Sequence, residues 1–181
     1  MKSTTLISTL LGAMMLLPIF IFSQQTANDH YQEGIALRKA GNYSQAIRSF
    51  DKAIQIEPKD PDYYYLRGLT KRKLDDFKGA IKDYDRAVQL YPAFKKAFFN
   101  RGIAKKHLKN YQGAISDYNQ AIELDGSYVS AYYNRGIARK SLGEYQAALK
   151  DFEKALQLKP GDPKAQKQLN STKEKLKKLG N

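Results

Sequence analysis

Residues 61–94 read PDYYYLRGLTKRKLDDFKGAIKDYDRAVQLYPAF. Gly68 and its apolar neighbours precede a break near Asp75, and apolar residues then recur from Phe77 to Leu90 at intervals of three and four. Those intervals place residues on one face of a helix. The stretch therefore predicts a helix, a short turn and a second helix.

This stretch is one of four similar blocks, which cover residues 27–60, 61–94, 95–128 and 129–162. Small residues recur at matching places in the blocks, in four columns: Gly34, Gly68, Gly102 and Gly136; Ala46, Ala80, Ala114 and Ala148; Ala53, Ala87, Ala121 and Ala155; and Ala36, Ala104 and Ala138. A fixed period of about 34 residues is the signature of an array in which one helical unit stacks on the next. We predict an all-α solenoid and expect its function on a surface built by repetition.

The small and aromatic columns have a packing explanation. We expect each glycine to face the first alanine column, so that two helix backbones approach closely enough to outweigh the roughly 1 kcal/mol that glycine costs in a helix. Aromatic residues begin each second helix and return seven residues later, where they share its core face. They are Tyr43, Phe77, Tyr111 and Tyr145, followed by Phe50, Tyr84, Tyr118 and Phe152. Pro58, Pro92 and Pro160 close three of the blocks, because proline cannot continue a helix.

Residues 1–23 have the composition of a secretory signal. Lys2 is followed by an apolar run from Leu6 to Phe22, then by the small Ser23, with no further charge before Asp29. That order is typical of a signal peptide, and the run is shorter than the roughly 20 apolar residues of a membrane-spanning helix. We expect cleavage after Ser23 and a soluble exported bacterial protein, periplasmic or secreted. The alternative is an inner-membrane anchor that is not cleaved.

The chain is strongly basic and has no cysteine. Its formal net charge is +13, and the positive charge per block increases toward the C-terminus. The lack of cysteine excludes disulfides and thiolate metal sites. Residues 163–181 carry an apolar stripe of Ala165, Leu169, Leu176 and Leu179 among six lysines. Because the last repeat of a solenoid needs a polar cover, we predict a basic capping helix there. A basic arm for an anionic envelope surface is the second interpretation of the same segment.

Catalytic motifs are missing from the sequence. His30 and His107 occupy different places in their blocks and have no metal-ligand spacing. No glycine-rich phosphate loop or nucleophile motif occurs. We therefore expect no enzyme, no cofactor and no metal. Nucleic acid is not an expected partner either, because an exported chain rarely meets it.

The four blocks resemble tetratricopeptide repeats, in their glycine and alanine columns, their second-helix aromatics and their closing prolines. The resemblance covers about three quarters of the chain. It implies a right-handed superhelix of four repeats, residues 24–162, followed by the capping helix 163–181. The family's common tryptophan at the fourth position of a repeat is replaced by other rings: His30, Tyr64, Phe98 and Tyr132.

A second departure from the family involves two positions of the repeat that change together. Arginine at the seventh position coincides with aspartate at the twenty-third, in Arg67 with Asp83, Arg101 with Asp117 and Arg135 with Asp151. The first block has Glu33 and Ser49 instead and lacks both. The joint absence predicts three partly buried ion pairs, each between the two helices of one repeat and each of little net stability.

In proteins of this family, first helices line a concave groove that binds extended or helical peptides. Carried onto this chain, the groove positions form three rows along one helical face. The aromatic row is Tyr31, Tyr65, Phe99 and Tyr133; the aliphatic row is Ile35, Leu69, Ile103 and Ile137; the basic row is Arg38, Arg72, Lys106 and Lys140. Asn100 and Asn134 stand beside them and are expected to bond a ligand backbone. The alternative is that the rings and aliphatic side chains partly pack between neighbouring first helices.

The basic row predicts a protein or peptide partner with acidic or amphipathic character. A subset of the family clamps the C-terminal carboxylate of chaperone peptides, but the matching positions here hold Tyr65, Leu69, Asn100, Ser130 and Asn134, and only Asn100 fits. We therefore reject a chaperone-type clamp. The leading hypothesis is an interaction scaffold, and the alternative is a binder of anionic envelope polymer or membrane through the C-terminal lysines. Self-association through the groove or the ends stays open.

Overall fold

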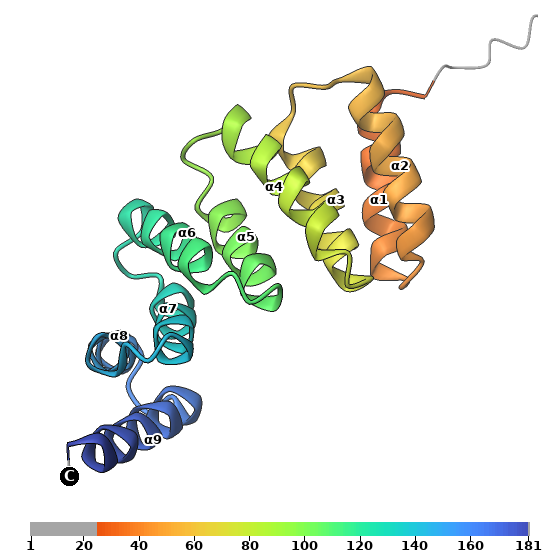
Figure 1. Ribbon diagram of the computed structural model, residues 1–181. Coiled ribbons are helices and arrows are strands. Elements are labelled where there is room, and N and C mark those ends of the chain that lie inside the picture. The colour runs from red at the N-terminus through yellow and green to blue at the C-terminus, as the bar shows by residue number, and fades with distance from the viewer. Residues whose placement is uncertain (1–24, 181) are drawn as a thin grey trace, which may run out of the picture.

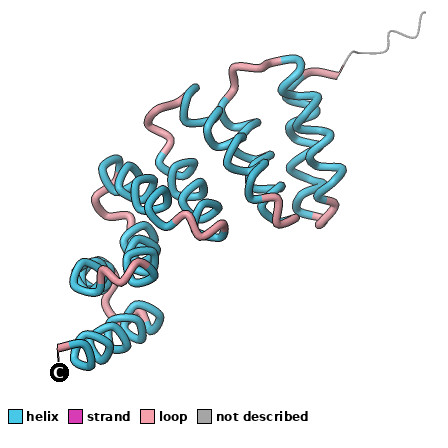
Figure 2. The backbone as a smooth tube through the Cα atoms, in the orientation of Figure 1, coloured by secondary structure: helices cyan, strands magenta, loops and turns pink. Residues whose placement is uncertain are grey.

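Nine helices and no strand occur in residues 25–180, the part of the chain that the computed structural model describes. In chain order they are α1 (Ala27–Lys39), α2 (Tyr43–Ile56), α3 (Pro61–Lys73), α4 (Phe77–Leu90), α5 (Lys95–His107), α6 (Tyr111–Leu124), α7 (Val129–Ser141), α8 (Tyr145–Leu158) and α9 (Pro163–Leu179). Short loops join them into an arc (Figures 1 and 2). The expected signal segment, residues 1–23, lies outside the described residues.

The helices form four antiparallel pairs and a final single helix. Each helix packs on its neighbours in sequence, and the odd-numbered helices also contact one another in succession, from α1 to α9. Within residues 25–180, the even-numbered helices make no such contact. The odd-numbered helices therefore line the inside of the arc, and α4, α6 and α8 lie on its outer side in Figure 1. No helix in this part of the chain is long and apolar enough to cross a membrane.

Local sequence sets where the helices begin and turn. Thr26 and Asp29 exchange side-chain to backbone hydrogen bonds in a capping box at the start of α1. Asp60 and Asp162 cap α3 and α9, each directly before a proline whose missing N–H is no loss in a first turn. The turns inside the four pairs each place one residue in the left-handed region of φ: Gly41, Asp75, Lys109 and Gly143.

The first-helix glycines accommodate aromatic rings of the second helix. A Cβ added at Gly102 would lie 2.7 Å from Cε1 of Tyr118, and one at Gly34 would lie 2.6 Å from Cε1 of Phe50. The atoms nearest to these added Cβ positions belong to the ring seven residues after the start of the second helix, a neighbour that the expected approach to the alanine column did not include. Glycine is required here by close approach rather than by its backbone angles.

Helix α9 closes the array at its C-terminal end. It buries Ala165, Leu169 and Thr172 and packs on α8, with further contacts to α7. Leu176 is half-buried, but Leu179 is 60% exposed, so the predicted apolar stripe ends before Leu179.

Candidate functional site

The inner face of the arc carries the three predicted rows, since all of their residues lie on α1, α3, α5 and α7. Each row repeats once per helix pair, and successive inner helices are in contact. The rows therefore run along the array as continuous lines from α1 to α7.

The aromatic row is half-buried, because its rings also join the repeats. Tyr65 packs on Tyr84 of its own pair, with ring centroids 6.1 Å apart, and on Phe94 of the next pair at 4.7 Å. Phe99 does the same with Tyr118 at 5.9 Å and Tyr128 at 4.9 Å. Burial raises the pKa of the Tyr65 hydroxyl. The rings thus stabilise the array and leave only part of their surface to a partner.

The aliphatic row lies deeper in the array. Leu69, Ile103 and Ile137 are half-buried and pack against the cores formed around Tyr84, Tyr118 and Phe152. These side chains give the inner face an apolar floor, in agreement with the interpretation that they partly serve packing.

The basic row has no carboxylate partner among the described residues. Lys106 donates to Oδ1 of Asn134 at 2.8 Å, and Lys140 donates to Gln168 and Ser171 of α9. The Nε atoms of Arg38 and Arg72 are buried without a hydrogen-bond partner in residues 25–180. Burial lowers the pKa of Lys106. Four half-buried positive charges therefore line the inner face without neutralisation.

A second set of cations, the arginines at the seventh position of repeats two to four, is bound to carboxylates. Arg67, Arg101 and Arg135 each bind the aspartate of their own pair, Asp83, Asp117 or Asp151, at 2.6 Å, which confirms the three predicted contacts. Each arginine also bonds the preceding pair, through Asp51, Asp85 or Asn119, which the repeat pattern did not predict. Each buried aspartate also binds a second cation that the pattern did not predict: Lys71, Lys105 or Arg139. These cations are neutralised by carboxylates within the array, whereas those of the basic row are not.

The two asparagines are engaged within the array. Asn100 is 8% exposed, and its Nδ2 donates to the carbonyl of Lys96 at 2.8 Å and to the hydroxyl of Tyr65 at 3.2 Å. Asn134 is half-buried, donates to the carbonyl of Ser130 at 2.9 Å and accepts from Lys106. Asn134 is therefore better placed than Asn100 to reach a ligand backbone.

The chemistry of this face is that of binding. It offers ring surface, aliphatic surface and positive charge on a scaffold held by ion pairs. In residues 25–180 no group of three or more His, Cys, Asp or Glu side chains is arranged to hold a metal ion. His30 is buried at the start of the array, and His107 is exposed and stacks on Phe77 with centroids 4.5 Å apart.

Comparison with known proteins agrees with this architecture. Models of the tetratricopeptide repeat match residues 61–94 and 129–162, and a TPR repeat model matches residues 34–75 and 105–143. No curated protein is similar enough in sequence to count as a match.

Solved structures are similar over most of the chain. A crystal structure of MamA is 26% identical with a TM-score of 0.79, and the match covers 82% of this chain and 81% of that one. The structure of YrrB, described as a TPR protein with an unusual peptide-binding site, is 26% identical with a TM-score of 0.71 over 77% of this chain and 72% of that one. The first TPR domain of Spaghetti (RPAP3), bound to the HSP90 peptide SRMEEVD, is 31% identical with a TM-score of 0.64 over 65% of this chain and 93% of that one. On its repeats, its helix pairs and these matches, the chain belongs to the tetratricopeptide repeat family.

Proposed function

We propose that this protein is a non-enzymatic interaction scaffold that holds an acidic or amphipathic peptide segment of a partner protein on its inner face. One observation carries the proposal: the basic row has no carboxylate partner in the described chain, whereas the structural arginines each have one. Unneutralised, half-buried cations beside apolar surface attract a segment that brings its own carboxylates. The half-exposed rings of the aromatic row add large contact area at low entropic cost.

The relatives support a peptide ligand. YrrB has a peptide-binding site, and the RPAP3 domain binds a peptide with acidic residues at its C-terminal end. The present chain has Tyr65 and Leu69 at the positions where chaperone-binding relatives clamp that end, so its cations act from a different row. We therefore infer that the ligand lies along the basic row and need not present a free C-terminus.

Export is part of the proposal. The composition of residues 1–23 supports placement outside the bacterial cytoplasm, with cleavage after Ser23. Sequencing the N-terminus of the protein purified from cell fractions tests this directly. A mature chain that begins at Gln24 in the periplasm or medium supports soluble export, and an intact Met1 in the inner membrane supports the anchored alternative.

Peptide binding is tested by fluorescence anisotropy with two labelled probes of equal length and apolar content, one rich in glutamate and one in lysine. We expect saturable binding of the acidic probe only, weakened by salt because screening reduces charge attraction. The R38Q/R72Q variant removes two charges of the basic row and should weaken binding about tenfold or more. A matched control, K82Q/K150Q, removes two exposed lysines from α4 and α8 on the outer side. Equal loss in both variants, or equal binding of both probes, contradicts the proposal.

A second candidate function is favoured by the exposed lysines of α9. Only Lys173 forms an ion pair among the α9 lysines in the described residues, with Glu153 at 3.8 Å. Clustered lysines next to an anionic membrane each contribute about 1 kcal/mol of attraction. Cosedimentation with vesicles of phosphatidylglycerol tests this function, and K175Q/K177Q/K178Q should lose binding while retaining the acidic peptide.

A further inference from the structure

Aromatic pairs seal the first three junctions between repeats. In each, a residue of the aromatic row contacts a ring that lies where one repeat ends and the next begins: Tyr63, Phe94 or Tyr128. Tyr31 packs on Tyr63 with ring centroids 5.0 Å apart, as the pairs of Tyr65 and of Phe99 described above do at similar distances. The tilt between the rings is similar too, at 42° to 45°.

The fourth junction lacks this second ring. In the described chain Tyr133 packs on Phe152 of its own pair, at 6.0 Å, and on no ring of α9 or of the loop before it. The residue that follows Tyr128 by one repeat is Asp162, and the residue that corresponds to Tyr63 is Ala165. Junction one and junction four share an Asp-Pro step, Asp60-Pro61 and Asp162-Pro163, and differ in the two residues that follow, Asp62-Tyr63 against Lys164-Ala165.

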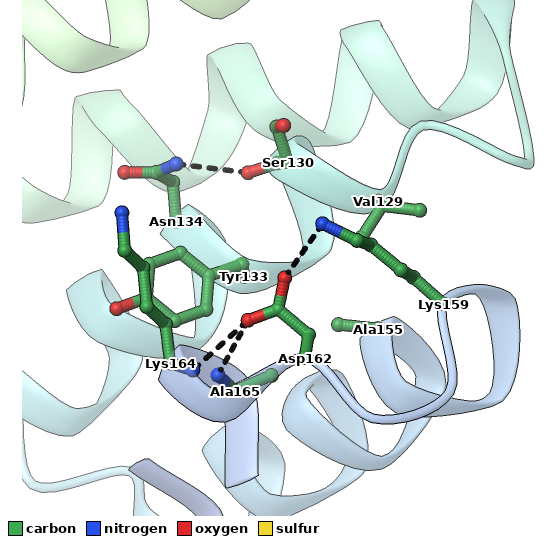
Figure 3. A pocket seen from close by; sticks show the side chains of 9 residues that line it. All are labelled: Val129, Ser130, Tyr133, Asn134, Ala155, Lys159, Asp162, Lys164 and Ala165. Atoms are coloured by element: carbon green, nitrogen blue, oxygen red, sulfur yellow. Dashed lines mark hydrogen bonds and ion pairs between the residues drawn. The ribbon is translucent and has the colours of Figure 1, made fainter. Parts of the chain in front are cut away.

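A cavity of about 340 Å³ lies where the missing ring would be. Its walls include Tyr133 from α7, Ala155 from α8, and Asp162 and Ala165 at the start of α9 (Figure 3). We call this cavity the end pocket. An apolar cavity of about 150 Å³ is enough to hold benzene, so the end pocket has room for an aromatic side chain.

The polar groups around the end pocket leave a positive charge at its rim. The Asp162 carboxylate is already bonded to Lys159 at 3.1 Å and to the backbone N–H groups of Lys164 and Ala165. The Lys164 side chain is exposed, lines the cavity and extends along the Tyr133 ring toward Asn134 in Figure 3. Its ammonium makes no ion pair in residues 25–180.

We propose that the end pocket binds an aromatic side chain of the peptide held on the inner face, with a neighbouring carboxylate of that peptide paired to Lys164. The proposal rests on the proposed function and adds a side-chain preference to it. A phenyl or phenol ring in the pocket would form with Tyr133 a tilted pair like those at the other junctions. Such ring pairs contribute binding free energy beyond that of burying their apolar surface.

The test uses small probes, so that it does not depend on knowing the natural peptide. Saturable shifts in the amide NMR signals of Ser130, Tyr133 and Ala165 are followed on addition of N-acetyl-L-phenylalanine, with N-acetyl-L-alanine as the control. The A165Y variant introduces a tyrosine at the position that corresponds to Tyr63 of junction one, so that the chain itself fills the pocket. We expect the phenylalanine probe alone to bind, and A165Y to weaken its binding about tenfold or more. Equal shifts with both probes, or unchanged binding by A165Y, overturn the proposal.

Two further measurements keep the proposal falsifiable if A165Y does not fold. K164Q changes an exposed residue. It should weaken the binding of N-acetyl-L-phenylalanine but not the binding of the uncharged amide of the same probe. Unequal effects on the two forms support the assigned role of Lys164, and equal effects contradict it. R38Q/R72Q should leave probe binding unchanged, because both arginines lie on α1 and α3. Failure of acidic peptides to bind, with the probe still bound, rejects the proposed function alone.

Discussion

Arg101 joins two repeats by binding Asp117 of its own helix pair and a carboxylate of the preceding one. Its Nε and Nη2 donate to Asp117 at 3.1 and 2.6 Å, and its Nη1 donates to Asp85 at 2.7 Å. The Asp117 side chain is 2% exposed, whereas that of Asp85 is 54% exposed. The two contacts made by one guanidinium therefore differ in energetic consequence.

Removing Arg101 should be strongly destabilising. Arg101→Met leaves Asp117 buried with Lys105, at 2.9 Å, as its remaining cation. Breaking a buried pair from one side costs about 3 kcal/mol because the other charge stays in a poorly solvated place. Urea unfolding at neutral pH measures the loss. Asp85→Ala, which removes only the exposed contact, should cost less than about 1 kcal/mol. A double-mutant cycle that finds no coupling between Arg101 and Asp117 would contradict the assignment.

Tyr118→Phe should stabilise the protein or leave its stability unchanged. The Tyr118 ring is fully buried, and its hydroxyl has no hydrogen-bond partner in the described chain. Phe50 and Phe152 occupy the same place in the first and last repeats and are equally buried. Removing an unsatisfied buried hydroxyl should raise the free energy of unfolding by about 1 kcal/mol. Tyr64→Phe is the control of opposite sign, because the Tyr64 hydroxyl donates to the carbonyl of Pro58 at 3.1 Å.

Lys109→Gly should stabilise the turn between α5 and α6. Lys109 has φ of 60°, where Gly41 and Gly143 stand in other repeats with φ of 81° and 80°. A side chain with a Cβ costs about 1 kcal/mol in this region, which exceeds the entropy that glycine adds to the unfolded chain. Thermal unfolding should show a higher midpoint. The gain should be smaller for Asp75→Gly, since aspartate tolerates left-handed backbone better than lysine, and an equal or larger gain there would count against this account.

Stability should depend on the ionisation of Asp125 at low pH. A hydrogen bond from Lys95, together with two from Ser127, lowers the pKa of Asp125 to about 2, below the unfolded value of about 4. Because the folded pKa is depressed, this contribution is complete above about pH 4 and is lost as the pH falls through about 2. Asp125→Asn should therefore be less stable than the parent at pH 7, and the difference should shrink as the pH falls toward 2 and vanish below it, as measured by urea unfolding.

Glu174→Gln is the control for that measurement, because Glu174 makes no ion pair in residues 25–180. This variant removes a carboxylate without removing an ion pair, so it shows the effect of the change in charge alone. A constant difference between Asp125→Asn and the parent across the acidic range would show that the Lys95 contact does not control the titration.

The architecture could be predicted from the sequence because the same helix pair occurs four times. Each recurrence of a glycine, alanine or aromatic ring at the same place in a block is independent support for the same packing of two helices. The joint absence of arginine and aspartate from the first block likewise predicted their contact. Periodicity assigns a residue to a face, however, and does not say which residue it touches there. That is why the repeat pattern did not reveal that the ring of Tyr118 lies against Gly102.

The junctions between repeats were the least predictable part. The bonds from Arg101 to Asp85 and from Arg67 to Asp51 cross from one repeat to the next, whereas the joint absence in the first block concerned residues of one repeat. The end pocket arises from a difference between junctions, at Asp162 and Ala165, rather than from a shared pattern. Comparing the last residue of each block and the third residue of the next would have revealed it.

Each repeat in residues 25–180 contacts only the repeats or the final helix next to it, so the number of repeats can vary without altering distant contacts. A duplicate of residues 95–128 inserted after the third repeat would meet the same surfaces that this repeat now meets. It would extend the inner face by one ring and one cation, and the end pocket would move outward unchanged with α9. Under the binding mode proposed above, the length of the bound segment and its aromatic side chain would be recognised by separate parts of the chain, which would give evolution and design two independent adjustments of one specificity.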